Sequence, residues 1–282
     1  MSQTKQQIQA LLAEAAAAPR YRFGQNFMID RNLVAIIADA GGLSGSDLAI
    51  EIGPGTGTLT EELLARAGEV LAVEIDRNLS VLLRQHFADK PHFRLIEGDA
   101  LAGKHQLNAE LLSSISTAQA QGRSVKLIAN LPYNIASPLV IELLIAGVTN
   151  LAFTVQKEVA IRLKGRADSD DYGPLTVMAQ LLADVRVDRI LPAQAFWPAP
   201  KIESALVIMT RHDQLGADAR PFGKFVQSLF AARRKMLRKT LQSDQCPDPE
   251  VILRPLGIDP QQRPEMLAPS QLLDIFRALR GT

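Results

Sequence analysis

Apolar positions in the first half of the chain follow two alternating patterns. Short apolar runs of strand length are separated by longer segments in which apolar residues recur with helical spacing. The runs predicted to be strands are 47–52, 69–75, 93–98, 125–130 and 150–156. The segments predicted to be helices lie near 58–67, 77–88, 106–120 and 137–146. This alternation predicts an α/β fold, a doubly wound and mostly parallel sheet of the Rossmann-like kind.

The second half of the chain departs from this alternation. Two β-rich runs, 184–191 and 204–211, flank the Pro-rich stretch FWPAPK and predict an antiparallel hairpin at the sheet edge. Beyond residue 215 the pattern is helical. We therefore expect a main domain at 30–215 and a small all-helical domain at 216–282.

The beginning of the chain is expected to be an accessory segment. Residues 1–29 precede the first regular helix and are interpreted as an N-terminal arm or lid, with 8–19 as a short helix or frayed end. Asp30 and Ser137 stand where helix N-caps are expected, and Pro138 follows Ser137 in the first turn of its helix.

Composition narrows the class of protein. The chain has 282 residues and 47% hydrophobic residues, enough for a sizeable core. No run of about 18 apolar residues predicts a membrane span. A single cysteine, Cys246, excludes an internal disulfide framework and a thiolate zinc cluster, and the four histidines show no ligand spacing. We expect a cytoplasmic protein without a metal centre.

Charge is distributed unevenly along a chain whose net charge is only +1. Residues 1–219 carry 20 Lys and Arg against 24 Asp and Glu, a net charge of −4, whereas 220–282 carry 11 against 6, a net charge of +5. Five cations are concentrated in residues 231–241, AARRKMLRKTL, named here the basic segment: Arg233, Arg234, Lys235, Arg238 and Lys239. A helix there with a solvated face is one interpretation. The alternative is a phosphate-binding surface.

A glycine-rich loop follows the first predicted strand, in the sequence EIGPGTGTLT. Gly53 and Gly55 allow a sharp turn and close approach of a ligand to the backbone. The spacing departs from the GxGxxG dinucleotide fingerprint, because the third glycine comes one position early. Glu74 ends the next strand, about 20 residues further on, where a carboxylate accepts both hydroxyls of a ribose.

Asp99 ends the third predicted strand at the same edge of the sheet. Ligands of such sheets bind outside the carboxyl ends of the strands.

Two nucleotide classes fit these positions. NAD carries a pyrophosphate, which favours a longer glycine-rich loop. S-adenosylmethionine carries no phosphate, so that a glycine loop, a ribose carboxylate and an adenine-binding Asp suffice for it. Ordinary turns with strand-end acids remain the structural alternative.

The fourth predicted strand ends in Asn130-Leu131-Pro132-Tyr133, which suits an acceptor that is an exocyclic amine of a nucleobase. The lone pair of such an amine is delocalised into the ring, so the amine is a poor nucleophile. The Asn130 side-chain oxygen and the Leu131 carbonyl can each accept one N–H, which exposes the lone pair. Pro132 fixes φ and aims that carbonyl, and Tyr133 offers a flat face for the base. A turn after a strand is the alternative interpretation.

Six motifs together resemble those of one family: FGQNFM (23–28), EIGPGTGTLT (51–60), NLPYNIASP (130–138), FTVQKEVAIRL (153–163), YGPL (172–175) and FWPAPKIESALV (196–207). They are similar to the small-subunit ribosomal RNA adenine dimethyltransferases, the KsgA/RsmA family. The resemblance covers about residues 20–240. Met28 stands where the family commonly has Leu, residues 103–124 are long for their place, and the tail beyond about 240 matches weakly.

The resemblance implies S-adenosylmethionine as the cofactor and assigns roles to residues. It implies that Glu74 binds the ribose, Asp99 the adenine, and Asn130 both the cofactor and the target amine. The positions implied to bind the cofactor are Asn26, Met28, Gly53, Gly55, Glu74, Asp99 and Asn130.

The resemblance also implies a substrate, two adjacent adenosines in a hairpin loop near the 3′ end of small-subunit rRNA, each dimethylated during ribosome assembly. Tyr133 and Phe196 are implied to sandwich the target adenine, although Phe196 beside Trp197 could instead cover an edge of the core. Lys201 is expected to contact phosphate, or else to be an ordinary surface charge. Nothing in the sequence requires more than a monomer.

Two other functions remain open at this stage. One is a 23S rRNA adenine methylase, which shares the glycine loop and the Asn-x-Pro-Tyr type of motif; PAPKIESAL and the basic segment favour the small-subunit family. The other is a non-catalytic ribosome-assembly or nucleic-acid-binding factor on the same fold. Intact Asn130 and Tyr133 argue for retained chemistry.

Overall fold

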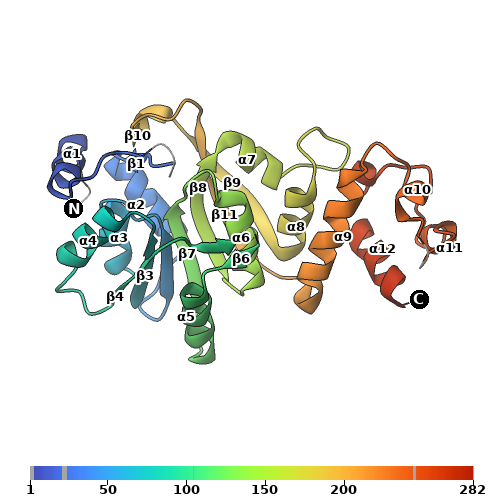
Figure 1. The fold of residues 1–282 in the computed structure, drawn as a ribbon, viewed down its shortest axis with the longest axis horizontal. Helices are drawn as coiled ribbons and strands as arrows, with labels where there is room; N and C mark the ends of the chain where they lie inside the picture. The colour runs from blue at the N-terminus through green and yellow to red at the C-terminus, as the bar shows by residue number, and fades with distance from the viewer. Residues whose placement is uncertain (1–2, 21–23, 104, 244–245, 282) are drawn as a thin grey trace. The chain divides into compact units, whose positions relative to one another are not determined.

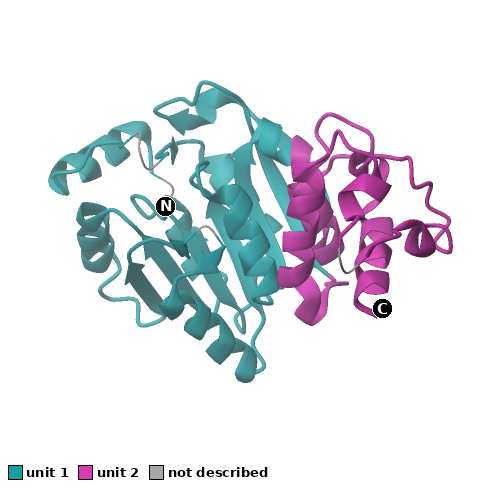
Figure 2. Ribbon diagram, turned by 45° about the vertical axis from the view of Figure 1, so that its right-hand side comes forward, with its two compact units in different colours: residues 1–160, 185–211 teal, residues 161–184, 212–282 magenta. Residues whose placement is uncertain are grey.

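The computed structural model describes residues 3–20, 24–103, 105–243 and 246–281. Two compact units make up these residues, coloured teal and magenta in Figure 2. Unit 1 contains residues 1–160 and 185–211, and unit 2 contains 161–184 and 212–282. Phe23, the first residue of the FGQNFM motif, lies outside the described residues.

A sheet of seven strands in the order β4-β3-β2-β7-β8-β11-β9 confirms the predicted fold class (Figure 1). Its strands are β2 (Leu48–Ile52), β3 (Glu69–Glu74), β4 (Phe93–Glu97), β7 (Val125–Asn130), β8 (Asn150–Gln156), β9 (Ala183–Leu191) and β11 (Ser204–Arg211). The strands from β4 to β8 pair in parallel, and β11 pairs antiparallel with β8. As predicted, the two later β-rich runs lie together at one sheet edge.

Burial explains why β2 has no alternation of apolar and polar residues and contains Glu51 as its one polar residue. Every residue of β2 is buried, and β2 lies between β3 and β7. A parallel strand covered on both faces reads as a continuous apolar run. The chain winds outward from β2 to β4 and then returns to β7 on the other side. The switch point between β2 and β7 is where such folds bind ligands.

The helices of unit 1 connect the strands. They are α1 (Lys5–Glu14), α2 (Arg31–Ala40), α3 (Thr58–Leu64), α4 (Arg77–His86), α5 (Ala109–Ala120) and α6 (Ala136–Ile145), with α7 (Lys157–Leu163) at the boundary to unit 2. The predicted helix at 106–120 begins later than expected, because a small hairpin of β5 (Leu101–Gly103) and β6 (Gln106–Leu107) precedes it. Asn108 then caps α5.

One of the two predicted helix caps is confirmed. The Asp30 carboxylate accepts hydrogen bonds from the amides of Asn32 and Leu33. The prediction for Ser137 is wrong, because α6 starts at Ala136 and no side chain caps it. The Ile135 amide donates to the Pro132 carbonyl, so a turn of the Asn-Leu-Pro-Tyr motif leads directly into the helix.

A two-stranded antiparallel sheet joins two motifs that are far apart in the sequence. β1 (Phe27–Met28) pairs with β10 (Phe196–Trp197), and the Ile29 amide donates to the Ala195 carbonyl. The FGQNFM arm therefore lies against the FWPAP segment.

Unit 2 is mainly helical, with α8 (Pro174–Leu182), α9 (Ala219–Ala231), α10 (Leu237–Leu241), α11 (Glu250–Leu253) and α12 (Pro269–Gly281). The predicted boundary at residue 215 places α8 in the main domain, whereas the structure groups it with the C-terminal helices. Packing explains this difference. α8 contacts α9 and α12, and the buried Tyr172 donates a hydrogen bond to the Leu267 carbonyl at 2.7 Å.

Candidate functional site

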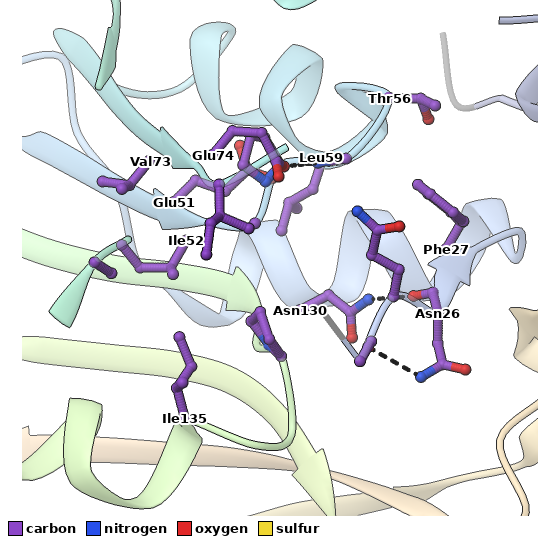
Figure 3. A pocket seen from close by; sticks show the side chains of 18 of the residues that line it. Asn26, Phe27, Glu51, Ile52, Thr56, Leu59, Val73, Glu74, Asn130 and Ile135 are labelled. Carbon is purple, nitrogen blue, oxygen red and sulfur yellow. Dashed lines mark hydrogen bonds between the residues drawn. The ribbon is translucent and has the colours of Figure 1, made fainter. Parts of the chain in front are cut away.

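A cleft opens at the carboxyl ends of β2, β3, β4 and β7, all in unit 1 (Figure 3). It encloses about 970 Å³ of space, open solvent included. The cleft brings together all the residues predicted to bind the cofactor: Asn26, Met28, Gly53, Gly55, Glu74, Asp99 and Asn130.

The glycine loop forms one wall of this cleft. Gly53, Gly55 and Gly57 have φ values of 72°, 61° and 86°, in the left-handed region that favours glycine. A Cβ on Gly55 would lie 3.0 Å from the ring of Phe27, so a side chain there would collide with the arm. The loop thus presents bare backbone to the cleft.

Glu74 lies at the end of β3 with 3% of its surface exposed. Its two carboxylate oxygens accept hydrogen bonds from the backbone amides of Gly55, at 3.2 Å, and Asp76, at 2.9 Å. Burial raises the pKa of Glu74 to about 7, against the opposing effect of these two bonds. Each oxygen keeps further lone-pair capacity, so the carboxylate can also accept from a ribose hydroxyl.

Glu51 is a second buried carboxyl beneath the cleft, which the sequence analysis did not single out. It accepts a hydrogen bond from the Thr60 hydroxyl at 2.6 Å. Burial, with a smaller contribution from the nearby Glu74, raises the pKa of Glu51 to about 8. At neutral pH this carboxyl is mostly protonated and adds little negative charge to the floor of the cleft.

Asp99 is exposed at the end of β4, and its position depends on the β5–β6 hairpin. Its carboxylate accepts from the Leu101 amide at 3.0 Å, and its carbonyl accepts from the Asn108 side chain at 3.1 Å. The same Asn108 side chain caps α5. Asn108, which belongs to the long segment 103–124, thus helps to position Asp99, the residue expected to bind adenine.

Asn130 ends β7, and two bonds determine the orientation of its carboxamide. The side-chain nitrogen donates to the Asn26 carbonyl at 2.7 Å. A carbonyl can only accept, so the nitrogen must face Asn26. The side-chain oxygen then accepts from the hydroxyl of Thr154, its neighbour on β8, at 2.5 Å. One lone pair of that oxygen remains for another donor.

Tyr133 follows Asn130 and is half-buried. Its hydroxyl shares a hydrogen bond with the Ser204 hydroxyl, with the two oxygens 2.5 Å apart. Burial raises the pKa of Tyr133, so the phenol stays neutral at physiological pH. Pro132 lines the cleft, whereas the side chain of Leu131 is buried.

The structure does not present Phe196 as the predicted second face of a base sandwich. Its side chain is 2% exposed and belongs to an apolar cluster with Met28, Val34 and Leu206. β10 turns the ring inward, because Phe196 pairs with Met28 in the small sheet. In this conformation the ring covers the core, which was the alternative interpretation.

The residues predicted to bind RNA lie apart in the chain. Lys201 is exposed in unit 1, in the loop between β10 and β11. The cations of the basic segment belong to unit 2, and all five are exposed. Arg238 lies 3.8 Å from the Glu250 carboxylate.

The prediction that the basic segment is one helix is wrong. α9 ends at Ala231 and α10 begins at Leu237, so that Arg233, Arg234 and Lys235 lie in the turn between them. The amides of Leu237 and Arg238 donate to the carbonyls of Gln262 and Pro260. These bonds to a distant loop take the place of the helical hydrogen bonds that propensity alone predicts.

Besides Glu51, sequence reasoning missed three side chains that shape the site. Ile75, directly after Glu74, lines the cleft with 42% of its surface exposed. The sequence did contain a signal for this residue, because Ile75 directly follows Glu74, the acid predicted to end a strand at the ligand site. Thr154 and Ser204 hold Asn130 and Tyr133, but they come from β8 and β11. Only the register of the sheet connects them to the Asn-Leu-Pro-Tyr motif.

Two classes of feature were not found in the part of the chain that the structure describes. No group of three or more His, Cys, Asp or Glu side chains is arranged to hold a metal ion. No helix there is both long enough and apolar enough to span a lipid bilayer.

The family model described as ribosomal RNA adenine dimethylase matches residues 17–280. This match extends beyond the 20–240 span expected from the motifs and includes the tail that resembled the family only weakly. A curated relative from Magnetococcus marinus, ribosomal RNA small subunit methyltransferase A, is 42% identical over 273 residues, 95% of this chain and 94% of that protein.

Two solved structures resemble the chain over most of its length. A dimethyladenosine transferase from Plasmodium falciparum has a TM-score of 0.71 at 21% identity, covering 90% of this chain and 98% of that one. The 23S rRNA methyltransferase ErmE has a TM-score of 0.63 at 26% identity, covering 90% and 100%. At 21% identity the first of these supports the fold alone.

Proposed function

Because the chain belongs to the ribosomal RNA adenine dimethylase family, we propose that it uses S-adenosylmethionine to dimethylate the 6-amino groups of two adjacent adenosines. The proposed target is the 3′-terminal hairpin loop of small-subunit rRNA, in an assembling subunit in the cytoplasm. The name of the Magnetococcus relative supports the small subunit at 42% identity, against 26% for the 23S enzyme.

The residues of the cleft fit this cofactor. The Glu74 carboxylate is buried beside the glycine loop and retains acceptor capacity for ribose hydroxyls. Ile75 exposes an apolar surface of the kind that packs against an adenine, and Asp99 stands at the rim to accept from the adenine amino group. When bound, S-adenosylmethionine supplies a methyl group on a positively charged sulfur.

Asn130 carries the central chemical role. Its side-chain oxygen has one lone pair left after the Thr154 bond, which suits one N–H of the target amine. The Leu131 carbonyl is proposed to accept the second N–H. Two acceptors at fixed positions draw the nitrogen toward tetrahedral geometry and expose its lone pair. The contribution of these residues is positioning and dipole orientation.

No general base is required before the transfer. The amine proton becomes acidic once the nitrogen has gained carbon and positive charge, and it then leaves through an accepting oxygen to solvent.

Tyr133 is proposed to support the unstacked base. Its hydroxyl is anchored to Ser204, so the ring is held in one orientation. Stacking of a base on an aromatic ring contributes about 1 to 3 kcal/mol. Removal of the target nucleotide from its stack is the usual route by which an enzyme reaches a base. Phe196 can join this platform only after a change from its buried position.

One observation supports the proposal most strongly: two hydrogen bonds fix the carboxamide of Asn130, and this residue lines the same cleft as Glu74 and the glycine loop. The test is mass analysis of nucleosides after purified protein and S-adenosylmethionine are incubated with small subunits that lack these methyl groups. We expect four methyl groups per subunit, all recovered as N6,N6-dimethyladenosine.

The large subunit provides the matched control substrate, and it should remain unmodified. Methyl groups on large-subunit RNA would favour the 23S alternative. Binding of subunits without any methyl transfer would favour a non-catalytic assembly factor.

A further inference from the structure

The glycine loop is held from outside the cleft by Gln3, near the beginning of the chain. Gln3 is 5% exposed, which is unusual for a glutamine. Its side-chain nitrogen donates to the Thr56 carbonyl at 2.9 Å. Its side-chain oxygen accepts from the hydroxyls of Thr56, at 2.6 Å, and Thr58, at 2.9 Å.

The chemistry of these three bonds allows only one arrangement. The Thr56 carbonyl accepts only, so the nitrogen of Gln3 must face it. The oxygen of Gln3 then uses both lone pairs on the two hydroxyls. Thr56 and Thr58 are buried and line the cleft, on either side of Gly57. One buried amide therefore joins two residues of the loop across a glycine.

Helix α1 fixes Gln3 in this place. Thr4 caps α1, and Gln7 bonds back to the Thr4 amide. On one face of α1, Ile8 and Leu12 are buried in an apolar cluster with Phe27, Leu79 and Leu82. Figure 1 shows α1 beside α4, which supplies the two leucines.

The end of the same segment is bound to the start of α4, which follows the strand that carries Glu74. The Ala16 carbonyl accepts from the Asn78 side chain at 2.8 Å. Arg20 lies 3.3 Å from the buried Asp76 carboxylate. Residues 3–20 therefore contact both the glycine loop and the segment that follows β3, the two elements that surround the proposed ribose site.

The loop needs such support because of its composition. Three glycines with positive φ give it more conformational freedom in the absence of contacts than residues with a Cβ would give it. Within the loop, the Gly57 amide donates to the Pro54 carbonyl. The carbonyl of Thr56, at the centre of the loop, is bonded by Gln3. Residues 3–16 also precede the region matched by the family model, which begins at residue 17.

We propose that α1 is a clamp that keeps the glycine loop in its cofactor-binding conformation, with Gln3 as the positioning residue. Binding to a preorganised loop avoids the entropy cost of ordering it. Gln3 thus sets cofactor affinity without contact with the reacting atoms. This inference rests on the proposed use of S-adenosylmethionine.

The test compares Gln3→Ala with Gln9→Ala, which removes an exposed glutamine of α1. The measurements are the Kd for S-adenosylhomocysteine, the steady-state constants, the thermal midpoint and hydrogen exchange of the loop amides. In Gln3→Ala we expect Kd and the KM for S-adenosylmethionine to rise about tenfold. We also expect kcat at saturating cofactor to be unchanged and the amides of residues 55–58 to exchange faster. Gln9→Ala should match the wild type.

An unchanged Kd in a folded Gln3→Ala protein would overturn the clamp. A parallel fall of kcat and thermal midpoint, with uniform exchange across unit 1, would also overturn it, because it would mean a general loss of structure. Wild-type protein that binds S-adenosylhomocysteine but methylates no RNA would contradict the proposed function alone. Wild-type protein that binds no S-adenosylhomocysteine would contradict both.

Discussion

The cofactor cleft of unit 1 and the basic segment of unit 2 hold their polar groups in opposite ways. In the cleft, Glu74 and Asn130 each make two hydrogen bonds that fix the direction of their oxygens. In the basic segment, Arg233, Arg234 and Lys235 are exposed in a turn. The cleft is suited to a reaction that depends on the orientation of hydrogen-bonding groups. The basic segment is suited to electrostatic attraction, which depends on charge and not on orientation.

Charge reversal in the basic segment is expected to have a large effect on RNA binding and none on the cleft. The variant Arg233→Glu, Arg234→Glu, Lys235→Glu should weaken RNA binding about a hundredfold at low salt, because three phosphate contacts are lost. The slope of log K against log salt should become shallower by about 2. Cofactor affinity should not change. Titration of RNA at several salt concentrations measures both quantities.

A second triple variant controls for net charge. Lys90→Glu, Arg186→Glu and Arg189→Glu reverse three exposed cations of unit 1. If both variants reduce the slope equally, the effect comes from the total charge of the protein. The basic segment would then be an ordinary solvated surface, the other interpretation of its sequence.

A smaller effect is expected in the cleft from Thr154→Val. Valine keeps the shape and the preference for strand but removes the hydroxyl that donates to Asn130. We expect kcat to fall about tenfold with the Kd for S-adenosylhomocysteine unchanged, since the carboxamide loses one of its two fixed bonds. Single-turnover rates and calorimetry measure the two constants.

Thr154→Ser is the matched variant, because it retains the hydroxyl, and it should keep most of the wild-type rate. Equal losses in the valine and serine variants would mean that packing of the Thr154 methyl group, rather than its hydrogen bond, matters for turnover.

The same contrast explains what the sequence could predict. Glu74 and Asn130 each end a strand, Asp99 comes two residues after one, and parallel strands bring their carboxyl ends to one edge. Apolar runs were therefore enough to place these residues in one cleft. The five predicted strands and their parallel order depend on the same local pattern, and the structure confirms them.

Features that depend on distant partners escaped the sequence analysis. Gln3 gains its role from Thr56 and Thr58, more than 50 positions away. The basic segment has helix-forming residues, yet bonds to Gln262 and Pro260 interrupt the helix. Phe196 is turned into the core by its pairing with Met28. Local propensity contains no information about such contacts.

The turnover number of Asn130→Ala on small subunits tests whether the Asn130 carboxamide makes an adenine amine reactive. We expect methyl transfer to fall by at least about a thousandfold, while thermal unfolding stays close to that of the wild type. Asn32→Ala, which removes an exposed asparagine from α2, should transfer methyl groups at the wild-type rate. Wild-type turnover in Asn130→Ala would rule out the role proposed for this side chain.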